Sequence, residues 1–283
     1  MIIKNIKHIL ILLVISFITS CSSPKTTPEL LNNYCKKLSF SSLIQELKAL
    51  QKKDTFHKYK FGSIQERDII GNYKENLFVF RKFIKQKESI GDSYVFKLII
   101  KDSLIISCEI FDIIYDYEIV GYPFNSNDLL FVNTNVEEKN KLKIKFEKIF
   151  KKKLNFNELF QTDSYFGINC GGISSRPTSE ILKISELIDK KNANGIENWL
   201  QSSSTEKQLY GLIGYYKLRD SVKFRKYVPK IVKAIEMKTG KYSSCSGCTR
   251  NIAGSNIQEE IKKIKNNKYS LDFDYWYNRF DTN

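Results

Sequence analysis

The chain has 283 residues, of which 42% are hydrophobic and 27% charged, a balance typical of a globular protein rather than a disordered one. Its net charge of +15 favours acidic partners, although the basic residues are spread along the chain and do not form one block. There are only two histidines, His8 and His57, so a site built from several histidines is excluded within one chain. Histidine, the commonest general base, is nearly missing from the chain, so we favour a protein that is not an enzyme. We also predict no cofactor and no metal.

The N-terminal residues have the order of a bacterial secretion signal. Lys4 and Lys7 form a short positive region, and residues 9–18 are apolar except for Ser16. This apolar core has the length of a signal-peptide core and is well short of the roughly 20 residues that a membrane-spanning helix needs. We therefore expect residues 1–20 to be a cleaved signal peptide, and no later apolar run is long enough to span a bilayer.

The residues Ile18-Thr19-Ser20-Cys21 resemble the lipobox of bacterial lipoproteins, in which a branched apolar residue and two small residues precede an invariant cysteine. The resemblance implies that Cys21 begins the mature protein and carries a thioether-linked diacylglycerol, whose two acyl chains anchor a protein stably. Residues 21–27 are polar and form a short tether. Ser22 is not acidic, which in this family implies sorting to the outer membrane. The alternative is an ordinary cleaved signal with an incidental cysteine.

Residues 28–172 have the pattern of an α+β domain. A capping pattern of Ser42 and Gln45 precedes an apolar stripe and predicts a helix. Runs rich in Val, Ile, Phe and Tyr follow, separated by turn candidates, at 77–85, 94–101, 103–111 and 115–122. They predict an antiparallel meander, and the charged residues that interrupt them favour a sheet with one solvated face.

A lysine-rich helix is predicted after this meander. Thr134 and Glu137 form a capping box, and the apolar residues that follow recur at helical spacing up to three lysines at 151–153. The lysines of this helix either face an anionic surface or are simply solvated. The glycine-containing stretch 166–172, with residues 174–177, marks the boundary to a second domain.

Residues 178–283 have the pattern of an all-α domain. Apolar stripes predict short helices, and three capping pairs mark helix starts: Asn194 with Glu197, Thr205 with Gln208, and Ser255 with Gln258. Short helices joined by capped turns indicate antiparallel helical hairpins. The stretch 194–237, in which Val228-Pro229 opens a helix, resembles a HEAT-like helical repeat. A solenoid needs repetition, and the sequence has no second clean copy of this stretch.

Besides Cys21, the chain has five cysteines, and export would place them in an oxidising compartment: Cys35, Cys108, Cys170, Cys245 and Cys248. The motif Cys245-Ser-Gly-Cys248 has three interpretations. The favoured one is a structural disulfide within the motif. The others are a thiol–disulfide redox site and half of a zinc site, although no strand is predicted before the motif and no second pair of ligands accompanies it. The pairing of the other three cysteines is left open.

These patterns favour a membrane-tethered envelope protein that binds a partner protein. The repeat-like helices or the aromatic tail at 269–280 would meet that partner, such as an assembly component or a toxin neutralised by an immunity lipoprotein. Nucleic acid is not an expected partner for an exported chain, and the membrane face, periplasmic or surface, is left open. Two alternatives remain: a thiol–disulfide oxidoreductase that uses Cys245 and Cys248, and a purely structural envelope lipoprotein.

Overall fold

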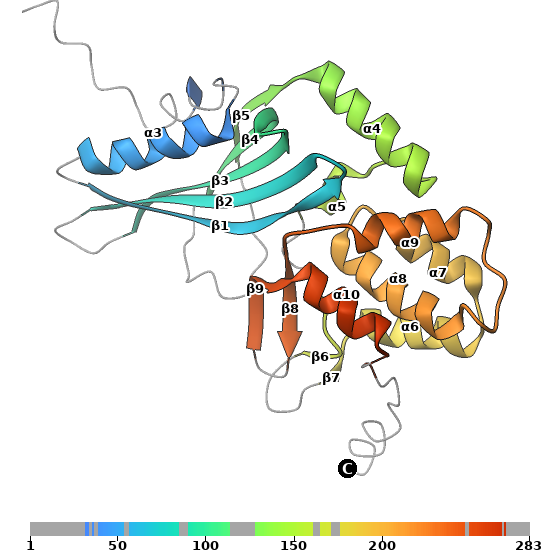
Figure 1. Cartoon of the computed structure of the whole chain (residues 1–283). Coiled ribbons are helices and arrows are strands. Elements are labelled where there is room, and N and C mark those ends of the chain that lie inside the picture. The colour runs from blue at the N-terminus through green and yellow to red at the C-terminus, as the bar shows by residue number, and fades with distance from the viewer. Residues whose placement is uncertain are drawn as a thin grey trace, which may run out of the picture.

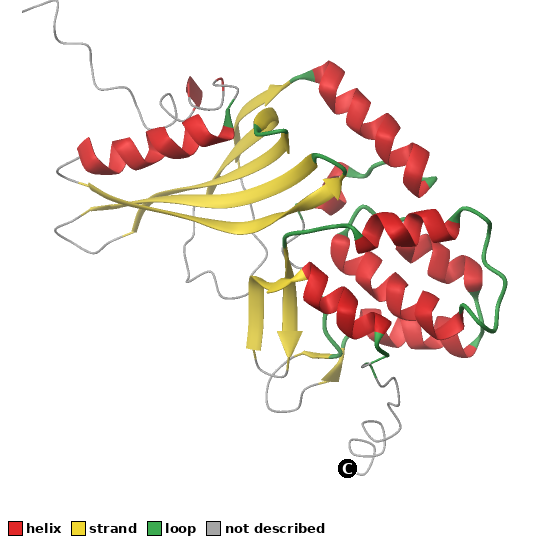
Figure 2. Cartoon of the chain, viewed as in Figure 1, coloured by secondary structure: helices red, strands yellow, loops and turns green. Residues whose placement is uncertain are grey.

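The computed structural model describes residues 39–53, 57–84, 90–113, 128–160, 165–170, 176–246 and 249–267, together with residues 32, 33, 36 and 269. The predicted signal peptide, the lipobox with Cys21, the tether and most of the aromatic tail lie outside these residues. An antiparallel sheet forms the first half, and a group of short helices with a small hairpin forms the second (Figures 1 and 2).

The sheet is a five-stranded antiparallel meander in which each strand pairs with its neighbours in sequence. Its strands are β1 His57–Ile70, β2 Tyr73–Ile84, β3 Ile90–Lys101, β4 Leu104–Ile113 and β5 Asp128–Thr134. The predicted meander is confirmed for β2, β3 and β4, whereas the sequence patterns missed β1 and β5. The strand predicted at 115–122 lies outside the described residues.

A two-residue turn joins β3 to β4. Lys101 pairs with Leu104, and the residues between them, Asp102 and Ser103, both have positive φ angles of 48° and 71°. Two consecutive positive φ angles define the type I′ turn, whose twist matches that of antiparallel strands. The predicted turn at 101–103 is therefore confirmed.

Both faces of the sheet are packed, so the predicted solvated face is wrong for its central strands. Helix α3, Phe40–Lys53, covers one face, where Leu43 and Leu47 join a buried cluster with Phe80 and Phe96 (Figure 1). On the other face, Leu77 and its same-face neighbours are also buried. This double burial explains why β2 has consecutive apolar residues rather than strict alternation.

Helices cover the second face and continue into the C-terminal half. They are α4 Val136–Phe150, α5 Phe156–Leu159, α6 Ser179–Asp189, α7 Ala193–Leu200, α8 Thr205–Leu218, α9 Val228–Glu236 and α10 Ile257–Lys265. Helix α8 lies among the others and is buried on most sides. It approaches α7 closely, because a Cβ added to Gly214 would lie 2.2 Å from the Cδ1 atom of Ile196. The series of predicted short helices is thus confirmed.

The C-terminal half is not all-α, and that prediction is wrong. Strands β8 Lys241–Ser246 and β9 Thr249–Asn256 form a hairpin between α9 and α10, and the short strands β6 Asn169–Cys170 and β7 Arg176–Pro177 pair before α6. The hairpin contains many serines and few of the branched residues typical of strands, so its sequence does not have a strand pattern. Contacts with β1 and with Phe166 hold it in place.

One hydrophobic core includes residues from both sides of the predicted domain boundary. Ile69 and Ile99 of the sheet, Phe146 of α4, and Leu209 and Ile213 of α8 belong to the same buried cluster. The backbone also joins the two halves, because Arg67 of β1 forms a β-bridge with Gly240. A Cβ at Gly240, which has a φ of +107°, would lie 2.3 Å from the carbonyl oxygen of Glu66. Only glycine permits this close approach.

Candidate functional site

Of the two cysteines in the predicted motif, the structure describes Cys245, and Cys245 pairs with a cysteine outside the motif. Cys245 of β8 forms a disulfide with Cys170 of β6, with the two Cα atoms 5.5 Å apart and the two cysteines 75 positions apart in sequence. The predicted Cys245–Cys248 bond is therefore corrected to Cys170–Cys245. Cys21, Cys35 and Cys248 lie outside the described residues. Cys108 of β4 is disulfide-bonded as well.

Cys245 lies on a strand and is buried, which differs from the exposed helix N-terminus that activates redox cysteines. The backbone N–H of Cys245 donates to the carbonyl oxygen of Phe166 at 3.1 Å. A Cβ added to Gly167 would lie 2.2 Å from the carbonyl oxygen of Cys245, so the two segments are in close contact. The disulfide thus holds the hairpin against residues 165–170. The oxidoreductase alternative stays a hypothesis that this arrangement neither tests nor favours.

A groove of about 670 Å³ lies beside this disulfide. Its wall includes Phe166, Tyr242 and Tyr269, and the first ring packs edge-on against the other two, with centroids 5.7 and 5.9 Å apart. Glu260 is almost fully buried there and accepts hydrogen bonds from the Tyr242 hydroxyl at 2.6 Å and from Lys263 at 3.1 Å. Burial and the neighbouring carboxylate raise the pKa of Tyr242 well above its usual value, so the hydroxyl stays protonated.

A buried group of four charges lies where the sheet meets the helices. The Arg67 guanidinium of β1 contacts the carboxylates of Glu75 on β2 and Glu206 on α8, and it also donates to the Leu159 carbonyl oxygen at 3.1 Å. Lys238 lies in the same buried region, with its amine 3.5 Å from the Thr205 hydroxyl.

Burial disfavours the charged forms of Glu75, Lys238 and Arg67. Burial raises the pKa of Glu75 to about 7 against the attraction of Arg67, and it lowers the pKa of Lys238 to about 8. The two nearby carboxylates outweigh the burial of Arg67 and raise the pKa of its guanidinium. We interpret this group as structural, because its cations and carboxyl groups are buried together where the sheet meets the helices.

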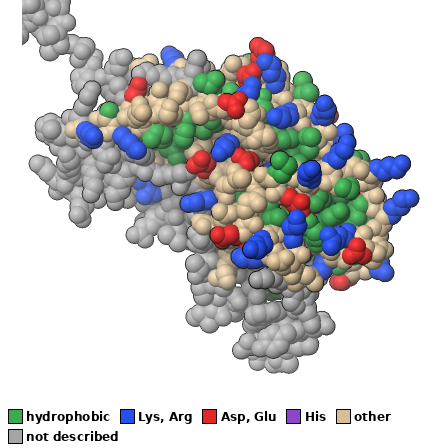
Figure 3. Space-filling view, viewed as in Figure 1, with side chains coloured by type: hydrophobic (Ala, Val, Ile, Leu, Met, Phe, Trp, Pro, Cys, Tyr) green, Lys and Arg blue, Asp and Glu red, His purple; other side chains and the backbone are tan. Residues whose placement is uncertain are grey.

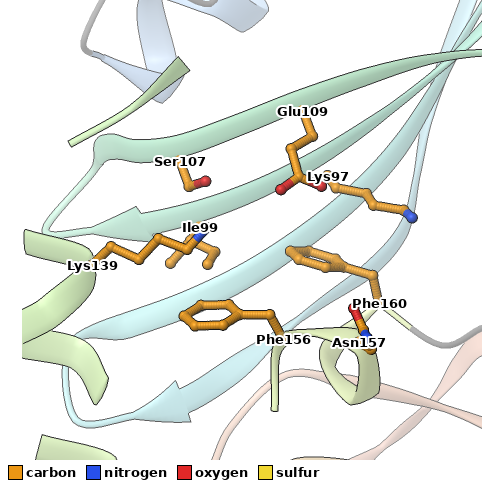
Figure 4. A pocket seen from close by; sticks show the side chains of 8 residues that line it. All are labelled: Lys97, Ile99, Ser107, Glu109, Lys139, Phe156, Asn157 and Phe160. Atoms are coloured by element: carbon orange, nitrogen blue, oxygen red, sulfur yellow. The ribbon is translucent and has the colours of Figure 1, made fainter. Parts of the chain in front are cut away.

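A second cavity, of about 180 Å³, lies between the second face of the sheet and helices α4 and α5; we call it the α4–α5 cleft (Figure 4). Cross-strand pairing places Lys97 of β3 beside Glu109 of β4, and Ile99 beside Ser107. The opposite wall carries Lys139 of α4 together with Phe156, Asn157 and Phe160 of α5 and its C-terminus. Figure 4 shows Lys139, Phe156 and Phe160 pointing from the helices into one space, whereas the Lys97 side chain extends away from Lys139.

The two lysines that line the α4–α5 cleft contact aromatic rings. The amine of Lys97 lies 4.3 Å from the centroid of the Phe111 ring, and the amine of Lys139 lies 4.5 Å from that of Phe156. Among the described residues, neither lysine forms an ion pair, whereas Lys101 and Lys141 both pair with Glu138. Partial burial lowers the pKa of Lys97, and Glu109 offsets this only in part.

The described residues contain no group of three or more His, Cys, Asp or Glu side chains that could hold a metal ion. His57 begins β1, but its side chain lies outside the described ones. None of the described helices is long and apolar enough to cross a membrane. Basic side chains are dispersed over the face shown in Figure 3 among acidic and apolar ones. Sequence analysis did not predict the α4–α5 cleft, because its residues come from β3, β4, α4 and α5.

The chain matches no family model, no curated protein and no solved structure. Its function is therefore argued from its own residues.

Proposed function

We propose that this protein is a bacterial envelope lipoprotein, tethered to a membrane by lipid on Cys21, that acts by binding a partner protein. The observation that carries the tether is the sequence Ile18-Thr19-Ser20-Cys21 behind a short apolar core. Ser22 favours the outer membrane as the anchoring site. The disulfide between Cys170 and Cys245 supports export, because disulfides form and persist in oxidising compartments.

Exposed apolar side chains on the sheet edge support the binding role. Leu129 and Val132 of β5 are 53% and 48% exposed, and Leu130 and Val136 beside them are also exposed. Register places Val132 beside Glu109 and Leu129 beside Phe111, so both lie on the sheet face that carries the α4–α5 cleft. Apolar patches next to a polar cavity are typical of protein-interaction surfaces.

We also propose that α7, α8 and α9 form one HEAT-like unit. The close approach of α7 and α8 at Gly214, together with Pro229 at the start of α9, supports this interpretation. A single unit of this kind would serve as a packing layer that holds α5 and the sheet in place.

A pull-down with sequence variants tests the proposed function. The lipidated protein is crosslinked in intact cells and recovered from membranes, and we expect one partner protein to be recovered with it. In the double variant Leu129→Ser/Val132→Ser, recovery of this partner should drop at least about tenfold, because each apolar side chain contributes roughly 1 kcal/mol or more to a buried contact. Met237→Ser, which removes an exposed apolar side chain from the end of α9, is the matched control and should retain the partner. Equal recovery with both variants would contradict a binding surface at β5.

Mass spectrometry of the N-terminal peptide tests the tether separately. A peptide that begins at Cys21 and carries the mass of a diacylglycerol is expected. An unmodified N-terminus, or one that starts elsewhere, would overturn the lipoprotein assignment.

A further inference from the structure

We infer that the α4–α5 cleft is a binding site for an aromatic carboxylate, either a free small molecule or the carboxylate and ring at the C-terminal residue of a protein. This inference names a ligand chemistry beyond the proposed function and does not depend on lipidation. It rests on the charges, the rings and the size of the cleft.

The charges of the cleft favour an anion. Lys97 and Lys139 reach the cavity from opposite walls, and Lys143 lies farther along the same helix with its amine 5.7 Å from the Phe156 ring. Within the described part of the chain, these amines contact rings and are in no ion pair with a carboxylate. The half-buried amine of Lys97 is compensated only in part by its cross-strand neighbour Glu109, and a ligand carboxylate would supply both further negative charge and hydrogen-bond acceptors.

The rings of the cleft favour a flat apolar body. Phe156 and Phe160 form one side and Ile99 the other (Figure 4). Aromatic rings gain most from an offset or edge-on partner ring. The amide of Asn157 and the hydroxyl of Ser107 add polar contacts at the rim.

The short helix α5 is held from behind, so the cleft does not have to form when a ligand arrives. Glu158 accepts hydrogen bonds from the Ser202 hydroxyl at 2.9 Å and the Ser203 backbone N–H at 3.0 Å, and it pairs with Lys207 at 3.2 Å. These contacts direct Glu158 toward the segment between α7 and α8. A site held in this way loses little entropy on binding.

The size of the cleft limits the ligand to one ring with its charged group. Its volume of about 180 Å³ is below the roughly 300–1,000 Å³ of cavities that hold drug-sized molecules. Glu109 is the one carboxylate among the described residues that line it, and it would repel a ligand carboxylate that came close. We therefore expect the ligand carboxylate to lie nearer to Lys139, with Glu109 opposing binding.

Calorimetry with three matched probes tests the ligand chemistry on the purified protein. Phenylacetate should bind at least about tenfold more tightly than benzylamine or benzyl alcohol, because only the anion pairs with the lysines. Lys139→Gln and Lys97→Gln should each weaken phenylacetate binding by about tenfold, and Glu109→Gln should strengthen it. Lys148→Gln, an exposed lysine of the same helix, is the control and should leave the affinity unchanged.

Two further arms identify the source of the carboxylate. The first arm uses a Gly-Gly-Gly-Phe peptide with a free C-terminus and the same peptide with an amidated C-terminus. If the free form binds more tightly than phenylacetate and the amidated form does not bind, the site is assigned to a protein terminus. Phenylacetate binding that is as tight as that of the peptide would assign it to a small molecule. Equal affinity for all three probes, or phenylacetate binding that survives both lysine variants at unchanged melting temperature, would overturn the inference. These results are independent of the pull-down at β5.

Discussion

The disulfide between Cys170 and Cys245 joins residues 75 positions apart, so it restricts the unfolded chain more than a bond between neighbouring cysteines would. It also fixes the β8–β9 hairpin against residues that precede α6. We expect Cys245→Ser and Cys170→Ser to lower the free energy of unfolding by roughly 2–4 kcal/mol each, measured by denaturant titration without reductant.

Cys248→Ser is the matched control for this bond. Because Cys245 pairs with Cys170, we expect this third variant to keep the wild-type unfolding midpoint. Equal losses in Cys248→Ser and Cys245→Ser, with no loss in Cys170→Ser, would restore the pairing within the motif. Peptide mapping of the unreduced protein would then show which two cysteines are joined.

The β3–β4 hairpin provides a prediction at the level of a single element. Ser103 has a φ of 71° in an exposed turn, a conformation that glycine adopts without steric cost. We expect Ser103→Gly to raise the free energy of unfolding by about 0.5–1 kcal/mol in thermal or denaturant unfolding. Ser41→Gly in helix α3 should have the opposite effect, a loss of about 0.5 kcal/mol, because glycine disfavours helices. A loss in both variants would contradict the turn geometry.

Local sequence patterns predicted the existence of most elements but not their starting residues. Helix α4 is capped by Asn135 rather than Thr134, α7 by Asn192 rather than Asn194, α8 by Ser204 rather than Thr205, and α10 by Asn256 rather than Ser255. In each of these segments the predicted and the observed cap both have side chains that can accept from the backbone, so sequence alone does not distinguish them. Tertiary contacts then select one, as where the Thr205 hydroxyl instead contacts Lys238.

Strands were harder to predict where long-range contacts rather than local pattern define them. β1 contains Gln65 and Arg67, which are polar yet buried, because they contact Glu75 and the carbonyl oxygen of Leu159. β8 is rich in serine, and its position depends on β1 and Phe166. The α4–α5 cleft could not be predicted for the same reason, because Lys97 and Lys139 are distant in sequence and line one cavity only in the folded chain.

At the scale of the whole molecule, the buried charges join the two halves. Arg67 belongs to β1 and Glu75 to β2, so their ion pair lies within the sheet. The ion pair of Arg67 with Glu206, at the start of α8, crosses the interface between the sheet and the helices. Replacing one member leaves an uncompensated buried charge, which costs more than the intact group contributes. This arrangement favours one relative placement of the sheet and the helices over alternatives that would separate the charges.

The raised pKa of Glu75 makes the stability of the whole fold depend on pH. The folded carboxyl keeps its proton up to about pH 7, whereas the ordinary pKa of a glutamate is 4.5, so the unfolded chain binds fewer protons between these limits. The free energy of unfolding should therefore fall by roughly 2–3 kcal/mol as the pH rises from about 5 to about 7.5. Glu75→Gln should flatten this decline in urea titrations, while Glu147→Gln, at an exposed position of α4, should retain it. If the free energy of unfolding depended on pH in the same way in wild type and in Glu75→Gln, Arg67 would hold Glu75 ionised over this whole pH range. The buried charges would then stabilise the fold as a fully ionised network.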